Sequence, residues 1–515
     1  MKEKINFLSD LNKRQKSAVL NVDGPTLVVA GAGSGKTKVL TSKLVYLVKQ
    51  KKAWPNQILC VTFTNKAAKE MRDRVIKILG GKVNSLAWLG TFHSISVKFL
   101  RRHAEAVGLK SNFTILDTDD QKKLIKNICK GENIDAKKIS PNFIMALIDQ
   151  WKNKGLLPQE VKLSKKNIFE NQILRVYKIY QNKIKDINAC DFGDLILYCV
   201  KLFEKNPDIR NIYSNNFKYI LVDEYQDTNF IQNKWLNLIV NKNKNICCVG
   251  DDDQSIYSWR GAEIKNFLSF DKVYPDCKIF RLEQNYRSTK NILDAASFLI
   301  SHNKDRLGKK LWSDGEKGES VKLNCYKNGR EEAQGIGSII EENIKKKNSL
   351  NNIAILVRAI YQTREFEERF LKIGVNYRIV GGTKFYERAE VKDAICYLRI
   401  INQKFDDLAF ERIINTPRRG LGESTIKQLH DFSSKNKICL EDSAHKLLQL
   451  NQFKPKTRSA IKHFLELLGK WRSDLKKKKH YDLLKIILDE SGYSAMLKNK
   501  KDLENENRIE NLKEL

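Results

Sequence analysis

The fold is decided by the stretch Thr26-Leu27-Val28-Val29-Ala30-Gly31-Ala32-Gly33-Ser34-Gly35-Lys36-Thr37. Its first half is apolar and predicts a buried strand, and its second half opens a helix, so the backbone amides of the glycine-rich loop can cradle a triphosphate. Lys36 is placed to reach the β and γ phosphates, and the hydroxyl of Thr37 to ligate Mg²⁺. Ala30 stands where the strict pattern has glycine. The loop Ala30 to Thr37 therefore predicts a site for ATP and Mg²⁺.

Further short apolar runs predict other buried strands of a parallel sheet. They are Ile58 to Thr62, Tyr219 to Val222, Ile246 to Val249 and Ile353 to Val357. Each is followed by a polar loop and then by a helical pattern, which is the alternation of a doubly wound α/β fold. Ligands of such sheets bind beyond the carboxyl ends of the strands, where the phosphate loop also falls.

Two carboxylates, Asp223 and Glu224, end the run Tyr219 to Val222. This placement suits one carboxylate to Mg²⁺ and the other to an attacking water molecule. An Asp-Glu pair by itself is common on protein surfaces. After a buried strand, and followed by Gln226 and Asp227, the pair indicates a metal ligand at Asp223 and a catalytic base at Glu224.

Composition sets limits on the partners and on the surroundings of the protein. The 515 residues exceed what one hydrophobic core serves, so several domains are expected. The net charge of +33 fits a polyanionic partner, and a lineage bias toward Lys explains it equally well. The ten scattered cysteines fit reduced thiols. Without an apolar leader or a run of about 18 apolar residues, we expect no membrane partner and a cytoplasmic protein.

Two segments change from alternation to a helical and basic pattern. The first runs from about Asn112 to Ile187 and the second from about Arg388 onward. We interpret both as helical insertions into the α/β framework. A solvated charged face accounts for the lysines of the first segment as well as a nucleic-acid contact does.

Several further motifs along the chain resemble those of a known protein family. Besides the phosphate loop, the motifs that carry the resemblance are Leu11-Asn12 with Gln15, Thr62-Phe63-Thr64-Asn65-Lys66-Ala67-Ala68, Gly90-Thr91-Phe92-His93-Ser94, Asp191-Phe192-Gly193-Asp194-Leu195, Val222 to Asp227, Val249 to Ala262 and Leu282 to Ser288. From about Leu11 to its last residue the chain resembles the UvrD, Rep and PcrA family of superfamily-1 DNA helicases. The resemblance implies RecA-like P-loop motor domains with two mainly helical insertions.

The resemblance implies roles for residues around the nucleotide. Lys36, Glu224, Gln254 and Arg287 would be catalytic, with Gln254 at the γ-phosphate or the water and Arg287 reaching the γ-phosphate from the second motor domain. Gln15 would read the adenine edge, because a carboxamide pairs with N6 and N7. Tyr286 would stack near the base. Lys38 stands where the family usually has Arg, whose plane stacks on adenine, so the selectivity for ATP is open.

The resemblance also implies contacts with DNA. The residues are Phe63, Asn65, His93, Tyr257, Trp259 and Arg260 in the motor domain, and Arg418 and Arg419 in a loop of the second insertion. Aromatic stacking accepts any base, which suits a motor that steps along arbitrary sequence. The alternative for the aromatic residues is a place in the core, and for the two arginines a basic turn. The partners implied are single-stranded DNA, duplex junctions and proteins of repair or replication.

The domain boundaries follow from the two insertions. We expect a first motor domain at 1–110 and 188–281, a DNA-contacting helical insertion at 111–187, a partial second motor domain at 282–387 and a partial helical insertion at 388–515. Two closing motifs of the family, one with a His and a Lys-Gly pair and one with Thr-Arg, are absent from the sequence. The second motor domain is therefore expected to be incomplete. The apolar spacing of Ile509, Leu512 and Leu515 predicts an amphipathic helix at the end.

Three functions remain open on the sequence. The first is an ATP-dependent 3′–5′ DNA helicase and single-strand translocase in repair, recombination or replication. The second is a truncated, hydrolysis-deficient, ATP-gated DNA-binding module that needs a separately encoded C-terminal fragment. The third is a subunit of a recombination nuclease, for which this sequence supplies no nuclease carboxylates.

Overall fold

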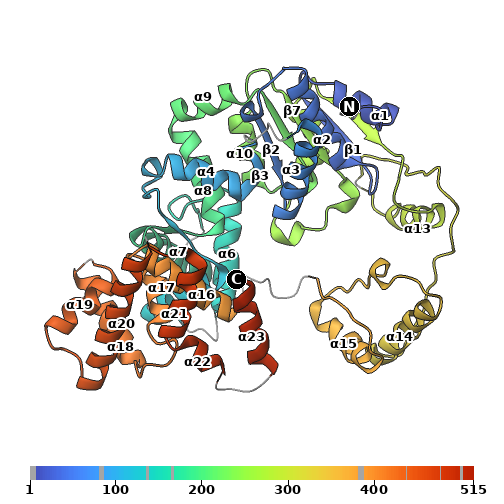
Figure 1. Cartoon of the computed structure of the whole chain (residues 1–515). Coiled ribbons are helices and arrows are strands. Elements are labelled where there is room, and N and C mark those ends of the chain that lie inside the picture. The colour runs from blue at the N-terminus through green and yellow to red at the C-terminus, as the bar shows by residue number, and fades with distance from the viewer. Residues whose placement is uncertain are drawn as a thin grey trace. The chain divides into compact units, whose positions relative to one another are not determined.

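The computed structural model describes residues 7–80, 86–134, 139–163, 168–304, 306–380, 388–436, 438–475, 477–498 and 503–515. The chain divides into two compact units, Met1–Val321 and Lys322–Leu515, and each is described by itself. The first unit is an α/β unit and the second is mainly helical (Figure 1). Among the described residues, no helix combines the length and the hydrophobicity that crossing a membrane requires.

A six-stranded sheet forms the centre of the first unit, in the order β3-β2-β6-β7-β1-β8. All its neighbouring strands are parallel. Its strands are β1 (Thr26–Ala30), β2 (Ile58–Thr62), β3 (Leu89–Thr91), β6 (Tyr219–Val222), β7 (Ile246–Gly250) and β8 (Lys278–Leu282). Four predicted strands of the first unit are thus confirmed. The last residue of β8, Leu282, pairs with Ala30, which brings the segment that follows β8 beside the phosphate loop.

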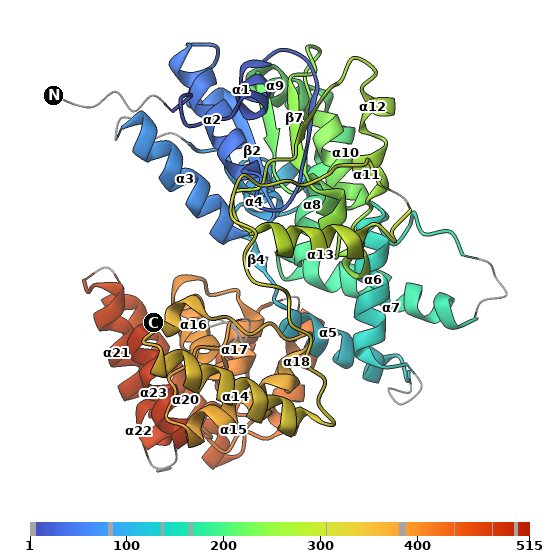
Figure 2. The same ribbon diagram turned by 90° about the vertical axis from the view of Figure 1, so that its right-hand side faces the viewer.

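Both faces of the sheet are buried along β1, β2, β3, β6 and β7, whereas the edge strand β8 is largely exposed. Along β1, Leu27 and Val29 contribute to one apolar cluster, while Val28 and Ala30 contribute to another on the opposite face. Successive side chains of a strand point to opposite faces, so a strand covered on both sides is apolar throughout. In Figure 2, α2 and α3 lie to the left of β2 and β7, and α10 lies to the right. The doubly wound arrangement predicted from the sequence is confirmed in this unit.

The helices of the sheet layers flank the strands in chain order. They are α1 (Lys13–Leu20), α2 (Lys36–Lys49), α3 (Asn65–Leu79), α4 (Phe92–Arg102), α8 (Phe192–Lys205), α9 (Pro207–Asn216), α10 (Phe230–Ile239), α11 (Lys265–Leu268) and α12 (Phe270–Val273). Most begin at a side chain that caps the free backbone N–H groups, such as Thr64 for α3 and Asp191 for α8. Functional loops at the strand ends are thereby held at fixed helix starts.

The basic segment predicted as an insertion contains α5 (Thr118–Gly131), α6 (Pro141–Asn153) and α7 (Ile168–Asp186). Its two ends are joined by a short parallel pair, β4 (Thr114–Ile115) with β5 (Ala189–Cys190). On α6, Lys152 is fully buried and lies 2.5 Å from Asp191 and 2.8 Å from Asp194 at the start of α8. An unpaired buried charge is costly, so this ion cluster fixes α6 against α8.

The predicted strand at Ile353 to Val357 is wrong for this structure. The segment forms no ladder with another described segment, and Leu356 is 95% exposed. An apolar run becomes a strand only where a neighbouring backbone meets its N–H and C=O groups. Around it lie α14 (Gly329–Lys345) and α15 (Thr363–Lys372), which pack through Ala333, Ile340, Phe366 and Phe370.

The rest of the second unit is helical in its described residues, as the sequence predicted. Its helices are α16 (Ala389–Asn402), α17 (Asp407–Ile413), α18 (Glu423–Asn436), α19 (Leu440–Gln449), α20 (Pro455–Asp474), α21 (His480–Glu490), α22 (Tyr493–Lys498) and α23 (Leu503–Glu514). They share one apolar core, against which Ile509, Leu512 and Leu515 are packed. The amphipathic helix predicted at these three residues is thus present.

Candidate nucleotide and DNA site

The phosphate loop connects β1 to α2 and is shaped by two glycines. Gly33 and Gly35 have φ of 69° and 89°, a region that side chains with a Cβ rarely adopt. The N–H of Ser34 donates to the carbonyl oxygen of Gly31 at 3.2 Å, and its hydroxyl donates to the same oxygen at 2.8 Å. No side chain caps the start of α2, because Gly35 occupies the cap position. The free N–H groups of that first turn are therefore available to an anion.

The carboxyl ends of β1, β6 and β7 bring the predicted catalytic groups together. Lys36 Nζ lies 3.8 Å from Glu224 Oε2 and 3.6 Å from Asp251 Oδ2. Glu224 adopts a left-handed backbone with φ of 49°, uncommon outside glycine, which turns the chain sharply after β6. A strained residue of this kind at a strand end is typical of functional sites.

The acidic groups beside Lys36 suit a divalent cation bound to a triphosphate. Asp223 is 3% exposed. Burial, followed by the charge of Glu224, raises the pKa of Asp223 to about 7, although Lys36 acts to lower it. Asp227 is also buried, and its Oδ1 has no hydrogen-bond partner among the described residues. A hydrated Mg²⁺ ion would meet both needs, since it prefers carboxylate, hydroxyl and water oxygens. The donor set therefore fits Mg²⁺, and the assignment of Asp223 and Thr37 as its ligands stays a prediction.

Gln226 connects the carboxylate of Glu224 to the loop after β7. Its Nε2 donates to Glu224 Oε2 at 2.9 Å, and its Oε1 accepts from the backbone N–H of Asp251 at 3.0 Å. Gln254, farther along that loop, donates from Nε2 to Asp251 Oδ2. Lys36, Glu224, Gln226, Asp251 and Gln254 thus form one polar network.

Gln15 was predicted to read the adenine edge, and part of its carboxamide is hydrogen-bonded within the protein. Gln15 is 2% exposed, its Nε2 donates to the carbonyl oxygen of Ser34 at 2.8 Å, and its Oε1 accepts from the N–H of Asn12 at 3.0 Å. A carboxamide has two donors and two acceptor positions, so one of each is left. Its contact with Ser34 joins α1 to the phosphate loop.

Residues that follow β8 lie directly against the phosphate loop. Asn285 Nδ2 donates to the carbonyl oxygen of Ala32 at 2.6 Å, and the N–H of Tyr286 donates to that of Gly33 at 3.0 Å. The Tyr286 hydroxyl accepts from Asn12 Nδ2 at 2.7 Å, which places the ring near α1. Arg287 is exposed, and its Cβ lies 2.7 Å from where a Cβ on Gly33 would be. Its guanidinium is therefore within reach of a phosphate held by the loop.

Aromatic side chains are gathered near the ends of β2, β3 and β7. Phe63 and Tyr257 stack with their ring centroids 5.3 Å apart, and Trp259 lies 6.4 Å from Tyr257. Trp259 is 69% exposed, so the interpretation of these rings as core residues does not hold for it. Asn65, at the start of α3, is also exposed. The side chain of Arg260 lies outside the described residues.

A second aromatic pair includes a residue whose role the sequence did not reveal. His93 packs edge to face with Phe192 at 5.9 Å between centroids. Burial lowers the pKa of His93 and favours the neutral ring. Phe192 is half exposed, although it sits between Asp191 and Gly193 in a motif quoted for the family resemblance. An apolar ring flanked by polar residues at a helix start is the sequence signal that marks Phe192 as a further candidate for stacking.

The two arginines predicted to contact DNA differ within the second unit. Arg418 is exposed. The guanidinium of Arg419 donates to the carbonyl oxygens of Ile413 and Ile414 at 2.8 and 3.0 Å and lies over the ring of Phe464. It also donates to the Tyr397 hydroxyl at 2.9 Å. Arg419 therefore holds the loop together, which leaves Arg418 as the stronger candidate for a phosphate contact.

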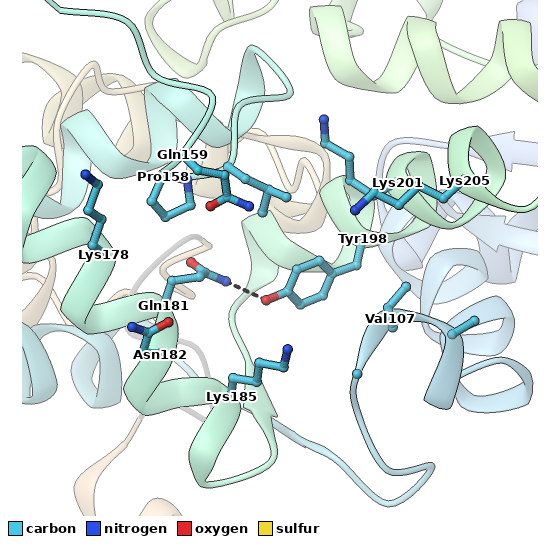
Figure 3. Close-up of a pocket in the computed structure, with 13 residues that line it drawn as sticks. Val107, Pro158, Gln159, Lys178, Gln181, Asn182, Lys185, Tyr198, Lys201 and Lys205 are labelled. Carbon is cyan, nitrogen blue, oxygen red and sulfur yellow. Dashed lines mark hydrogen bonds between the residues drawn. The ribbon is translucent and has the colours of Figure 1, made fainter.

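A cavity of about 570 Å³ lies between the basic insertion and α8 (Figure 3). At its floor Gln181 Nε2 donates to the Tyr198 hydroxyl at 2.6 Å. Its lysines are Lys178, Lys185, Lys201 and Lys205. One of them, Lys201, is paired with Glu160 at 2.6 Å. None of the phosphate-loop residues lines this cavity, so it is separate from the nucleotide site.

Two models of known protein families match this chain. The UvrD/REP helicase N-terminal domain model matches residues 11–275, and the UvrD-like helicase C-terminal domain model matches residues 280–515. We expected an incomplete second motor domain and a separately encoded C-terminal fragment. Neither expectation is supported, because the C-terminal domain model matches residues 280–515.

Curated relatives are similar over nearly the whole chain. A probable DNA helicase II homolog of Rickettsia felis is 44% identical over 99% of this chain and 78% of its own length. The DNA helicase II of Rickettsia typhi is 43% identical over 100% of this chain and 79% of its own length. The ATP-dependent DNA helicase PcrA of Staphylococcus epidermidis is 41% identical over 99% of this chain and 69% of its own length. With its phosphate loop, its acidic strand end and these matches, the chain belongs to the UvrD/Rep family of DNA helicases.

Proposed function

We propose that this protein is an ATP-dependent DNA helicase and translocase that moves 3′ to 5′ along single-stranded DNA and acts at duplex junctions. The observation that carries the proposal is the network from Lys36 through Asp251 to Gln254, which continues in the loop that presents Tyr257 and Trp259. One loop then joins a hydrolysis site to a surface for stacked bases. The 3′–5′ direction and a place in repair, recombination or replication come from the family resemblance.

At the nucleotide site the residues divide the work by their chemistry. The phosphate-loop amides and Lys36 would bind the triphosphate, while Asp223 and Thr37 would hold Mg²⁺, which neutralises phosphate charge when bound. Glu224 would orient the attacking water and accept its proton on the carboxylate that Gln226 holds. Arg287, exposed beside Gly33, would stabilise charge that develops on the γ-phosphate.

At the DNA side, aromatic rings at the surface suit bases of any sequence, and Trp259 and Phe192 are the most exposed of them. Trp259 with Tyr257 and Phe63 would form one stacking surface, and His93 with Phe192 a second. Asn65, Arg260 and, in the second unit, Arg418 would contact the backbone. A change at Gln254 on ATP binding or hydrolysis would then be felt at Tyr257, three residues along the same loop.

Steady-state ATP hydrolysis, with and without single-stranded DNA, tests the proposal. We expect strong stimulation by DNA and its loss in Lys36→Ala. The matched control is Lys49→Ala, which removes an exposed lysine from the far end of the same helix. Background hydrolysis in the wild type despite measurable ATP binding would favour an ATP-gated DNA-binding module instead. Displacement of strands from duplexes with 3′ or 5′ tails tests the direction.

A further inference from the structure

Three consecutive carboxylates, Asp251, Asp252 and Asp253, follow β7 and start the loop that carries Gln254. One oxygen from each lies within 4.8 Å of the others. Like charges this close repel one another, and two of the side chains are almost completely buried. The loop therefore needs a cation at this point to keep its shape.

Lys309 supplies that cation from a distant part of the sequence. Its Nζ lies 2.7 Å from Asp251 Oδ1, 2.5 Å from Asp252 Oδ1 and 2.7 Å from Asp253 Oδ2. An ammonium group has three N–H donors, so each can serve one carboxylate. The Lys309 side chain is 1% exposed. The ammonium occupies the position that a metal ion bound by the three carboxylates would take.

Neighbours of Lys309 extend this contact along the acidic loop. Arg306 binds Asp253 through two parallel hydrogen bonds, from Nε at 2.6 Å and from Nη2 at 2.8 Å. The backbone N–H of Leu307 donates to Asp252 Oδ2 at 2.8 Å. Bidentate Arg–carboxylate pairs fix orientation as well as distance. The segment 306–309 thus fixes the second and third carboxylates from one side.

The same segment continues to the phosphate loop. A Cβ added to Gly31 would lie 2.2 Å from Leu311 Cδ2, so the Leu311 side chain is in direct contact with that loop. The carbonyl oxygen of Trp312 accepts from the N–H of Asn285 at 2.8 Å, beside Tyr286 and Arg287. Residues 306–312 therefore connect the acidic loop with both sides of the nucleotide site.

Asp251 contacts both Lys309 and the polar network of the nucleotide site. Its Oδ1 is held by Lys309, while its Oδ2 accepts from Gln254 and lies 3.6 Å from Lys36. Removal of the ammonium would free Asp251 to move, and Gln254 with it. Tyr257 and Trp259 lie farther along the same loop, so their positions depend on the same anchor.

We propose that Lys309, assisted by Arg306, is a positioning residue that holds the Asp251–Asp253 loop and so links ATP hydrolysis at Gln254 to DNA contact at Tyr257 and Trp259. This inference rests on the proposed function. Lys309 touches neither nucleotide nor DNA in it, and acts through the loop that does.

The test compares the DNA-stimulated and basal turnover of Lys309→Met with those of Lys310→Met, which removes the exposed neighbouring lysine. We expect Lys309→Met to lower the DNA-stimulated kcat by about 100-fold, the scale of a misplaced catalytic group. The KM for ATP and the basal rate should change much less, and Lys310→Met should resemble the wild type. A wild-type stimulated kcat in Lys309→Met would overturn the proposal.

Two further variants separate positioning from a general loss of folding. Lys309→Arg should recover part of the stimulation, since a planar guanidinium keeps the charge but does not match three carboxylates. The double variant Asp252→Asn with Lys309→Met removes one charge of each sign, and should recover at least tenfold over Lys309→Met alone. If neither variant recovers stimulation, or if stimulation, basal rate and ATP affinity all fall in parallel in Lys309→Met, the proposal is wrong. Failure of the proposed function appears differently, as no Lys36-dependent turnover in the wild type.

Discussion

Gln226 holds the carboxylate of Glu224 from one side, its Nε2 donating to Glu224 Oε2 at 2.9 Å, and holds the start of the Asp251 loop from the other. Replacement of Glu224 by Gln keeps an oxygen that can accept this bond, but removes the base. We therefore expect Glu224→Gln to bind ATP like the wild type and to lower kcat by at least about 100-fold. Single-turnover hydrolysis together with binding of a fluorescent ATP analogue checks both parts.

Asp227 provides the comparison for that prediction. It is a second buried carboxyl group beside Glu224, and it has no assigned catalytic role. Burial, followed by the charge of Glu224, raises the pKa of Asp227 to about 7, and its Oδ1 is unpaired among the described residues. Near-normal turnover in Glu224→Gln, combined with loss in Asp227→Asn, would transfer the role of base to Asp227.

Arg287 is expected to act only when the γ-phosphate reacts. It is exposed beside Gly33, and no ion pair to a described carboxylate commits its guanidinium. Arg287→Ala should lower kcat by roughly 1,000-fold, the lower range for a lost arginine at a transferring phosphoryl group, with a much smaller change in KM for ATP. Arg74→Ala, which removes an exposed arginine of α3, is the matched control. Equal losses in both variants would show that Arg287 supports the fold instead.

Trp259 should contribute to DNA affinity through its exposed ring. Loss of one stacked base costs about 1–3 kcal/mol, so Trp259→Ala should weaken binding of single-stranded DNA by roughly 10- to 100-fold at fixed salt. Trp54→Ala is the control, because Trp54 is 72% exposed on the same unit but outside the aromatic loop. Fluorescence anisotropy with labelled oligonucleotides measures both. Unchanged affinity in Trp259→Ala would place the DNA elsewhere.

The sequence was sufficient to predict the parts of the site that depend on residues close together in the chain. The phosphate loop and the Asp223–Glu224 pair are local patterns that directly follow strands buried on both faces. Such strands can be recognised in a sequence as continuous apolar runs. The four strands predicted in the first unit follow from the same signal. Lys36, Glu224 and Gln254 could be brought together in advance because the carboxyl ends of parallel strands share one edge.

Long-range pairing explains what the sequence did not reveal. Lys309 looks like any solvated lysine in a chain with 94 basic residues, and only the fold places it among three aspartates. Arg419 was predicted to contact DNA, and nothing in the sequence indicated that its guanidinium donates to the carbonyl oxygens of Ile413 and Ile414 and to the Tyr397 hydroxyl. The apolar run at Ile353 to Val357 has the composition of a strand, yet no partner among the described residues. Partners cannot be inferred from composition.

Asp407, at the start of α17, allows a prediction about the stability of the second unit. Burial raises the pKa of its carboxyl group to about 6, although the hydrogen bond from the N–H of Leu440 and the charge of His430 act to lower it. The folded state therefore binds this proton more tightly than the unfolded chain does. Its stabilising effect is complete below pH 4 and is lost as the pH rises through about 6. At pH 8 the folded unit carries a charge that it disfavours.

Asp407→Asn removes that charge and keeps an oxygen to accept from Leu440. We expect the variant to unfold at a higher temperature than the wild type at pH 8, because it has no charge to bury at this position. Its free energy of unfolding should be higher by at most about 2 kcal/mol. The advantage should shrink at pH 5, where the wild-type carboxyl group is largely protonated in the folded state. Calorimetry at both pH values measures this, with exposed Asp431→Asn on α18 as the control. An advantage that is equal at pH 5 and pH 8 would mean that the carboxylate is solvated after all, and that the gain has a cause other than its charge.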